Sequence, residues 1–348
     1  MKNNLHNRMK VIIYPHVDPY YSGFYIYGLH LLYGKQNVHY SAKEFKDIPL
    51  DDVWNVYMAF IVEDENGHRT KYVIDSNDYN TVKQKMYDWC DVYGHCNANF
   101  SRYSKADYPK LVVLCPSFGI RCWSGWETAY YCITNICKLH FHAVPSVKRL
   151  IGRYYKQLKR SWYDEYLKSE PVRENYIFSH NTLWYNNGAC NNDAGLNKIR
   201  TVFIDACRDS EGITFEGGLV PRKRSKNQVH KFLNYLAKPI SHREYLQKEK
   251  QSMLVFNTPA FWDCHGWKLG EYLALGKCIV STPLSNELPP VDNASELFYF
   301  IEPNYDSMRD AISYLQQHPE TRTTLEKNVL SYWHKNGDPI ASLKRLGL

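Results

Sequence analysis

Residues 256–280 read Phe256-Asn-Thr-Pro-Ala-Phe-Trp-Asp-Cys-His-Gly-Trp-Lys-Leu-Gly-Glu-Tyr-Leu-Ala-Leu-Gly-Lys-Cys-Ile-Val280. The pattern predicts a strand over 253–256, a helix over 267–275 between Gly266 and Gly276, and a strand over 279–282. A strand, a glycine loop and a helix N terminus in this order direct free backbone N–H groups and the positive helix end toward one point. The stretch therefore predicts an α/β unit with an anion site at Gly266.

The same alternation of strands and helices runs through the rest of the chain. Further strands are predicted over residues 10–14, 53–62, 71–74, 110–115, 176–179 and 201–205, and helices over 24–33, 80–89, 147–168 and 307–318. Such alternation favours the α/β class with parallel sheets. We predict two domains, 1–170 and 171–325, followed by a helical tail over 326–348 that packs back on the first domain.

Composition narrows the class of protein. The chain has 348 residues, a formal charge of +7 and 44% hydrophobic residues, which excludes disorder as its main state. No run approaches the roughly 18–20 apolar residues that cross a bilayer, and the N-terminal residues lack the apolar core of a signal peptide. The 10 cysteines form no C-x-x-C pair, so we expect reduced thiols and a cytoplasmic location. If the protein contacts a membrane, we expect it at the inner face.

Two charged side chains follow the predicted anion site. Lys268 lies one residue inside the helix and adds positive charge for a phosphate. Glu271, three residues further on, shares the helix face of Lys268. A carboxylate beside a phosphate is unfavourable unless it has another task, and accepting hydrogen bonds from ribose hydroxyls is such a task.

The spacing Asp263-x7-Glu271 resembles the acidic motif of retaining glycosyltransferases of the family-4, or group 1, type. The segment Glu271-Tyr-Leu-Ala-Leu-Gly-Lys-Cys-Ile-Val280 is similar to the helix and strand that follow in that family. The resemblance implies the GT-B fold, in which two Rossmann-like domains face each other across a cleft and the second binds a nucleotide-sugar. It implies that Glu271 binds the ribose, that backbone at Gly266 approaches the diphosphate and that Asp263 lies beside the donor sugar. We place His265 and Trp267, which flank Gly266, in the same donor site.

The chain departs from the family in places. Asp263 stands where the family usually has Glu. The family also has an Arg and, about five residues later, a Lys that bind the phosphates. Arg208, after the predicted strand 201–205, matches this Arg, but Ile213 stands at the position of the Lys. Lys268, Arg222 or Lys223 are the alternatives for that charge. The inverting exostosin-like branch has a related loop and helix, so the stereochemistry stays open. Because no Asp-x-Asp triplet occurs, we expect no metal and no cofactor, the nucleotide-sugar being a co-substrate.

Residues 15–23, Pro-His-Val-Asp-Pro-Tyr-Tyr-Ser-Gly, follow the first predicted strand and are predicted to be a loop at the cleft. His16 or Asp18 could bind the acceptor or take its proton, and Gly23 could let donor phosphates approach. The alternative is an ordinary proline-rich turn. Arg121, His180 and the glycine-rich segment 215–221, predicted to be a loop, are weaker candidates for the same cleft.

Residues 148–160 hold six basic side chains, no acidic one, and Tyr154 and Tyr155. Three interpretations of this segment are a solvated linker helix, a peripheral contact with an anionic membrane, and nucleic-acid binding. No nucleic-acid motif accompanies the charges, so we expect no nucleic-acid partner.

We predict a glycosyltransferase that acts on a glycan or lipid-linked acceptor in polysaccharide biosynthesis. The rivals are a nucleotide-sugar epimerase or phosphorylase on the same scaffold, and a non-enzymatic protein that binds carbohydrate or nucleic acid.

Overall fold

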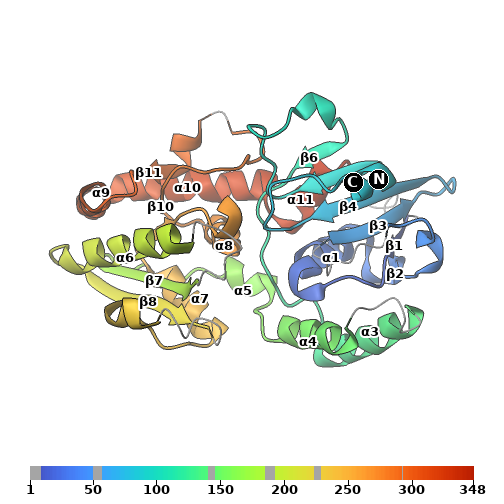
Figure 1. The fold of residues 1–348 in the computed structure, drawn as a ribbon, viewed down its shortest axis with the longest axis horizontal. Helices are drawn as coiled ribbons and strands as arrows, with labels where there is room; N and C mark the ends of the chain where they lie inside the picture. The colour runs from blue at the N-terminus through green and yellow to red at the C-terminus, as the bar shows by residue number, and fades with distance from the viewer. Residues whose placement is uncertain (1–8, 50–56, 140–145, 185–192, 223–228, 292) are drawn as a thin grey trace. The chain divides into compact units, whose positions relative to one another are not determined.

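The computed structural model describes residues 9–49, 57–139, 146–184, 193–222, 229–291 and 293–348. The chain divides into two compact units. Unit 1 consists of residues 1–165, 286–289 and 335–348, and unit 2 of residues 166–285 and 290–334. Both units combine helices with a sheet, and the α/β class predicted from the sequence is confirmed (Figure 1).

Unit 1 is built on one sheet with the strand order β2-β1-β3-β4-β5-β6. Its strands are β1 (Lys10–Ile13), β2 (Val38–Tyr40), β3 (Tyr57–Glu63), β4 (Arg69–Asp75), β5 (Val92–His95) and β6 (Leu111–Val113). Its helices are α1 (Pro19–Tyr33), α2 (Gln84–Trp89), α3 (Gly125–Lys138), α4 (Val147–Leu158) and α11 (Pro339–Arg345), with the short turns η3 (Lys35–Asn37), η4 (Lys43–Phe45) and η5 (Lys105–Asp107). Helix α5 (Tyr163–Leu167) crosses the boundary to unit 2.

The sheet of unit 1 is mixed, so the prediction of a purely parallel layer is wrong there. Strand β3 runs antiparallel to both β1 and β4. A tight hairpin causes this arrangement: the N–H of Asp64 donates to the carbonyl of His68, and Gly67 takes a φ of +80° that suits glycine. The remaining neighbours, β1 with β2 and β4 with β5 and β6, pair in parallel as expected.

Helix α11 lies against helix α1 of the same unit. Gly28 on α1 makes this contact possible, because a Cβ there would come within 2.6 Å of the carbonyl oxygen of Pro339. Residues 335–348 thus belong to unit 1, whereas residues 326–334 of the predicted tail belong to unit 2. Helix α10 (Pro319–Asn336) spans that division.

Unit 2 contains two parallel sheets, β7-β8 and β11-β10-β9. The strands are β7 (Tyr176–Leu183), β8 (Thr214–Pro221), β9 (Val255–Asn257), β10 (Ile279–Ser281) and β11 (Phe298–Phe300). The helices are α6 (Asp193–Asp209), α7 (His242–Gln251), α8 (Trp267–Ala274) and α9 (Tyr305–Gln317), with the turns η7 (Val229–Tyr235), η8 (Phe261–Asp263) and η9 (Ala294–Glu296). A core of Ile177, Phe203, Phe256, Val280 and Ile312 packs helices α6 and α9 onto the strands.

Strands β7 and β9 lie beside each other and run in the same direction. At their starts, Met253 N–H donates to the carbonyl of Tyr176 at 2.8 Å, and Phe178 N–H donates to Ser252 Oγ at 2.9 Å. Past their carboxyl ends, the rings of Trp184 and Phe261 stack with centroids 5.3 Å apart. Taken in the order in which they adjoin through β7 and β9, the strands of the two sheets follow one another as β8-β7-β9-β10-β11. This succession has the doubly wound pattern, in which the usual ligand crevice, the switch point, lies between β7 and β9.

Several sequence expectations are wrong in unit 2 and at its start. Residues 201–205 are not a strand but the middle of α6, where Leu196, Phe203 and Cys207 are buried at helical spacing and override the β-branched run. The segment 215–221 is not a loop but part of β8. The helix predicted over 147–168 is interrupted after α4, where Arg121 N–H donates to the carbonyl of Ser161.

Candidate functional site

The loop after β9 carries strained backbone at the switch point. Trp262 and Asp263, neighbours in η8, have φ of +60° and +58°, a left-handed conformation that costs a non-glycine residue about 1–3 kcal/mol. The loop is closed by the N–H of Ala260, which donates to the carbonyl of Cys264 at 2.8 Å. Strain of this kind persists where the surrounding structure holds it, which is typical of functional sites.

Helix α8 begins directly after this loop, as the sequence predicts. Gly266 is its N-cap, and within the described residues no side chain caps the helix. A Cβ at Gly266 would lie 3.2 Å from the Cβ of Ala260, so the loop packs closely against the helix start. Uncapped N–H groups and the positive end of the dipole are thereby directed toward the carboxyl ends of the strands.

Glu271 lies on α8 and is buried, with 4% of its surface exposed. Its two carboxylate oxygens each accept a hydrogen bond from a phenol: Oε1 from Tyr166 at 3.3 Å and Oε2 from Tyr245 at 3.2 Å. The hydroxyl of Tyr166 also lies 2.9 Å from Nε2 of His242. The two phenols hold the carboxylate in one orientation, and each carboxylate oxygen can accept more than one hydrogen bond.

Lys268, which the sequence analysis assigned to a phosphate, forms an ion pair with Glu249 on helix α7. Its Nζ lies 3.3 Å from Glu249 Oε1 and donates to the hydroxyls of Tyr245 and Tyr272 at 3.1 and 3.3 Å. Burial raises the pKa of Glu249, and the ammonium of Lys268 opposes that rise. Lys268 thus connects Tyr245, one of the two phenols that hold Glu271, to the buried carboxylate of Glu249.

Arg200 on helix α6 is a buried cation at the same place. Its Nη1 donates to the carbonyl of Thr182 near the end of β7 at 3.0 Å, while its Nε has no hydrogen-bond partner among the described residues. Burial lowers the pKa of Arg200 to about 10, and the groups whose charges oppose this are Tyr272 and Cys264, not a carboxylate. A buried guanidinium without a facing carboxylate is suited to an anionic ligand.

Arg222 adds an exposed cation past the end of β8. Its guanidinium lies over the ring of Trp184, 4.9 Å from the centroid, and Trp184 in turn stacks on Phe261 of η8. The sequence analysis named Lys268, Arg222 and Lys223 as alternatives for a phosphate-binding cation. Arg222 lies close to η8 through Trp184, whereas Lys223 is outside the described residues.

Arg208 does not follow a strand, and that expectation is wrong. It lies in the last turn of α6, where Nη2 donates to the carbonyl of Asn234 at 3.0 Å and the guanidinium covers the ring of Tyr235. The side chain is exposed. The buried cation that α6 contributes near the end of β7 is instead Arg200, which donates to the carbonyl of Thr182.

The candidates of unit 1 lie at the start of helix α1, which begins earlier than predicted. Asp18 is its N-cap: one carboxylate oxygen accepts from the N–H of Tyr20 and the other lies 3.2 Å from Arg153 Nε. His16 is buried, which lowers its pKa to about 4. Gly23 lies inside the helix, where a Cβ would be 3.0 Å from the carbonyl oxygen of Ile120.

The structure thus brings together one group of predicted residues. On the loop and first turns of α8 these are Asp263, His265, Gly266, Trp267, Lys268 and Glu271. The sequence analysis missed Tyr166, Tyr245, Glu249 and Arg200. A signal existed for the pair on α7, because Tyr245 and Glu249 are four residues apart and share a helix face.

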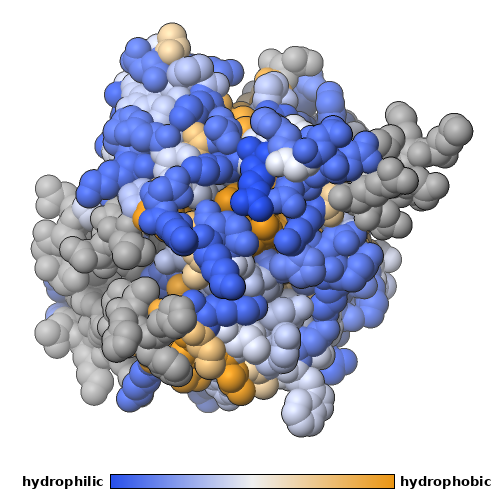
Figure 2. Space-filling view, turned by 90° about the vertical axis from the view of Figure 1, so that its right-hand side faces the viewer, coloured by the Kyte–Doolittle hydropathy of each residue, from blue (hydrophilic) through white to orange (hydrophobic). Residues whose placement is uncertain are grey.

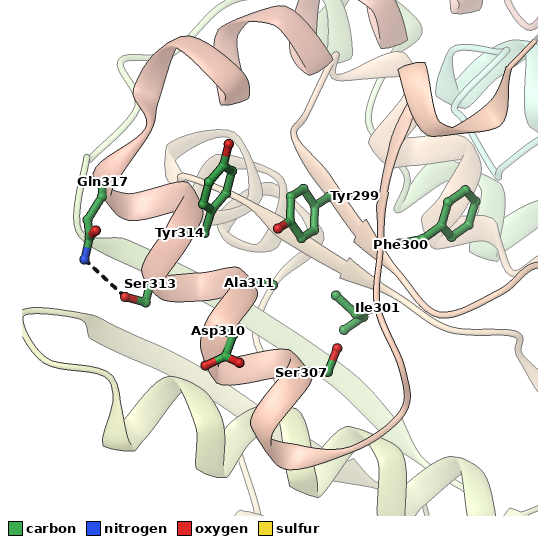
Figure 3. Close-up of a pocket in the computed structure, with 9 residues that line it drawn as sticks. All are labelled: Tyr299, Phe300, Ile301, Ser307, Asp310, Ala311, Ser313, Tyr314 and Gln317. Atoms are coloured by element: carbon green, nitrogen blue, oxygen red, sulfur yellow. Dashed lines mark hydrogen bonds between the residues drawn. The ribbon is translucent and has the colours of Figure 1, made fainter.

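A separate cavity of about 650 Å³ lies between β11 and α9 (Figure 3). Tyr299, Ser307, Asp310 and Tyr314 are among its lining residues, and Gln317 donates to Ser313 at its rim. Strand β11 is an edge strand of its three-stranded sheet, separated by β10 from β9, the strand that adjoins β7. This cavity therefore includes none of the predicted site residues.

Comparisons with known proteins give matches only among solved structures. No protein-family model matches the chain, and no curated protein matches it. The matched structures include a glycosyltransferase from Rickettsia africae (12% identity, TM-score 0.41, 77% of this chain and 66% of that one). Others are Anabaena HepE in complex with UDP and glucose (10%, TM-score 0.45, 76% and 64%) and a UDP-forming trehalose-phosphate synthase from Burkholderia vietnamiensis (14%, TM-score 0.43, 76% and 60%). The chain matches less than two thirds of the length of each of these proteins.

In the described residues, no helix is long and apolar enough to cross a membrane. The nine described cysteines form no disulfide with one another, and all except Cys137 are buried. The candidate site thus consists of the N terminus of α8, the buried carboxylate of Glu271 and the buried guanidinium of Arg200, in an α/β unit with parallel sheets.

Proposed function

We propose that the chain is a glycosyltransferase that moves a sugar from a nucleotide-sugar donor to a glycan or lipid-linked acceptor. The observation that carries this proposal is the position of Glu271, buried on the helix whose uncapped N terminus follows the strained loop at the β7–β9 switch point. An anion-binding end and a hydroxyl-binding carboxylate one turn apart suit a nucleoside diphosphate.

The proposal assigns the following roles within the site. The N–H groups after Gly266 and the guanidiniums of Arg200 and Arg222 bind the diphosphate, and Glu271 accepts from the ribose hydroxyls. Asp263 lies beside the donor sugar. These fixed positive groups stabilise the departing diphosphate, so the proposed transfer is metal-independent. Retention of configuration is part of the proposal because it follows from the family resemblance of the Asp263–Glu271 segment.

The acceptor side is proposed for unit 1. His16, neutral near pH 7 because burial lowers its pKa to about 4, and the adjacent Asp18 follow β1. Asp18 accepts a hydrogen bond from Tyr20 N–H and pairs with Arg153, so we assign Asp18 the role of positioning this segment. We assign the contact with the acceptor to His16. The basic face of α4 suits an anionic, lipid-linked acceptor, which connects the proposal to polysaccharide biosynthesis at the inner face of the membrane.

A thermal-shift screen with UDP, GDP, TDP and their sugars tests the proposal. A ligand at about 100 times its Kd adds roughly 2.7 kcal/mol of apparent stability, so at least one nucleotide is expected to raise the melting temperature. No shift across the panel would contradict the proposal. Incubating the protein with the donor alone separates the enzymes: an epimerase isomerises the donor without an acceptor, whereas a transferase needs one.

A further inference from the structure

The outward face of helix α3 is apolar. Its exposed positions between the helix ends share one side of the helix and carry no charge: Trp126, Ala129, Tyr130, Ile133 and Cys137. Trp126 is 88% exposed, Ile133 64% and Tyr130 61%. Helices of soluble proteins normally present charged or polar residues on this side. We call these five residues the α3 stripe.

The helix is firmly fixed, so this exposure is a property of the folded unit. Ser124 and Glu127 form a capping box at its N terminus. On the opposite side, Asn135 Nδ2 donates to Tyr154 Oη of α4 at 2.9 Å, and Gln157 Nε2 of α4 donates to Thr128 Oγ1 at 3.2 Å. Helices α3 and α4 therefore lie side by side (Figure 1). By helical spacing, the α3 stripe is on the side of α3 opposite to Thr128 and Asn135.

A basic cavity begins where the α3 stripe ends. Lys138, the residue after Cys137, lines a cavity of about 770 Å³ together with Lys10, His39, Lys43, Lys46 and Glu44. Four lysines against one carboxylate leave it positively charged. Partial burial lowers the pKa of His39, and the ammonium groups of Lys10 and Lys138 lower it further.

On the face drawn in Figure 2, hydrophilic side chains predominate, and hydrophobic ones are visible in its middle and near its lower edge. Helix α4 adds further positive charge, since Lys148, Arg149, Lys156 and Lys159 are exposed, whereas Arg153 is turned inward to Asp18.

We propose that unit 1 docks on an anionic phospholipid bilayer through the α3 stripe, with lipid headgroups bound in the lysine cavity. An indole, a phenol and an aliphatic side chain on one helix face suit the bilayer interface, and lysines beside them bind the headgroup phosphates. This site goes beyond the contact predicted from residues 148–160, because its anchor is the apolar face of α3. The docking does not depend on the proposed sugar transfer.

Charge favours a bilayer over a second copy of the chain. Two copies meeting through the α3 stripe and the adjoining cavity would bring two lysine clusters together, which is unfavourable. An anionic lipid surface instead attracts each basic side chain and accepts the apolar residues without an ordered partner.

Flotation of the full chain with vesicles tests the proposal. We expect at least tenfold stronger binding to phosphatidylcholine vesicles containing phosphatidylglycerol than to phosphatidylcholine alone. The triple variant Trp126→Ser, Tyr130→Ser, Ile133→Ser and the quadruple variant Lys10→Gln, Lys43→Gln, Lys46→Gln, Lys138→Gln should each lose tenfold or more. A control variant, Leu233→Ser with Tyr314→Ser, removes exposed apolar residues of unit 2 and should bind like the intact chain.

Other outcomes would overturn the proposal. Binding that is absent, equal on both vesicle types, or unchanged in the triple variant would exclude α3 as the anchor. A dimer in light scattering that the triple variant dissociates, without vesicle binding, would show a second copy on the stripe. Because the triple variant must fold to be informative, Trp126→Phe gives an independent readout: bromolipids should quench tryptophan fluorescence in the intact chain and less in this variant.

Discussion

The hydroxyl of Tyr245 donates a hydrogen bond of 3.2 Å to Oε2 of Glu271, joining helices α7 and α8 inside unit 2. The same hydroxyl accepts from Lys268 Nζ at 3.1 Å, so one phenol connects the buried carboxylate to the nearby ammonium. Burial and the carboxylates of Glu249 and Glu271 raise the pKa of Tyr245 well above its ordinary value, which keeps the phenol a donor. The orientation of Glu271 thus depends on a residue outside the α8 motif.

Tyr245→Phe should weaken nucleoside diphosphate binding about fivefold, since one hydrogen bond to a charged group contributes roughly 1 kcal/mol or more. Calorimetric titration with the nucleotide that the thermal-shift screen identifies measures this. The control Tyr314→Phe removes a hydroxyl on α9, a helix that contributes no residue to the candidate site, and should leave the affinity unchanged. Equal affinities for both variants would show that Tyr245 does not position Glu271.

Arg200→Met should reduce the affinity for the same nucleotide tenfold or more, because the substitution removes the buried guanidinium near the site loop. Arg208→Met is the matched control on the same helix and should have little effect, since Arg208 is exposed and contacts Asn234 and Tyr235. The reverse result would restore Arg208 as the phosphate ligand. Melting curves of both variants check that the fold is intact.

Ser252→Ala should destabilise the protein by about 2 kcal/mol, because it leaves the buried N–H of Phe178 and the carbonyl of Leu254 without the hydroxyl that both contact. Urea denaturation gives the change in free energy of unfolding. Ser313→Ala, on the surface of α9, should stay within about 0.5 kcal/mol of the intact chain. A similarly small effect for Ser252 would mean that the β7–β9 junction does not depend on this bridge.

His16 should make stability depend on pH. Burial lowers its pKa from 6.5 to about 4, so the unfolded chain binds more protons between these values. The contribution, at most about 3 kcal/mol, is present above pH 6.5 and is lost as the pH falls to 4. His16→Gln should flatten the curve of unfolding free energy in this window, whereas His68→Gln, in the exposed β3–β4 hairpin, should not. Superimposable curves for the intact chain and His16→Gln would contradict the assignment.

The sequence predicted the segment from β9 to β10 well because its signals are local. Gly266 and Gly276 mark the ends of α8, and Gly276 takes a φ of +60°. Asp263 and Glu271 are neighbours within this segment, so their spacing was informative without knowledge of the rest of the chain.

Features that depend on distant residues could not be predicted in the same way. The antiparallel pairing of β3 with β1 joins distant parts of the chain, and the helical state of residues 201–205 follows from burial of Phe203 against Phe256. The phenols on Glu271 come from residues 166 and 245, which no local spacing relates to α8.

The direct test of the central claim is equilibrium binding of the screened nucleoside diphosphates to the intact chain, Glu271→Ala and Glu271→Gln. Glu271→Gln keeps the size of the side chain and guards against a variant that fails to fold. The account predicts saturable binding of at least one nucleotide by the intact chain and at least tenfold weaker binding by both variants. Undiminished affinity in the two folded variants, or no binding by the intact chain, would contradict it.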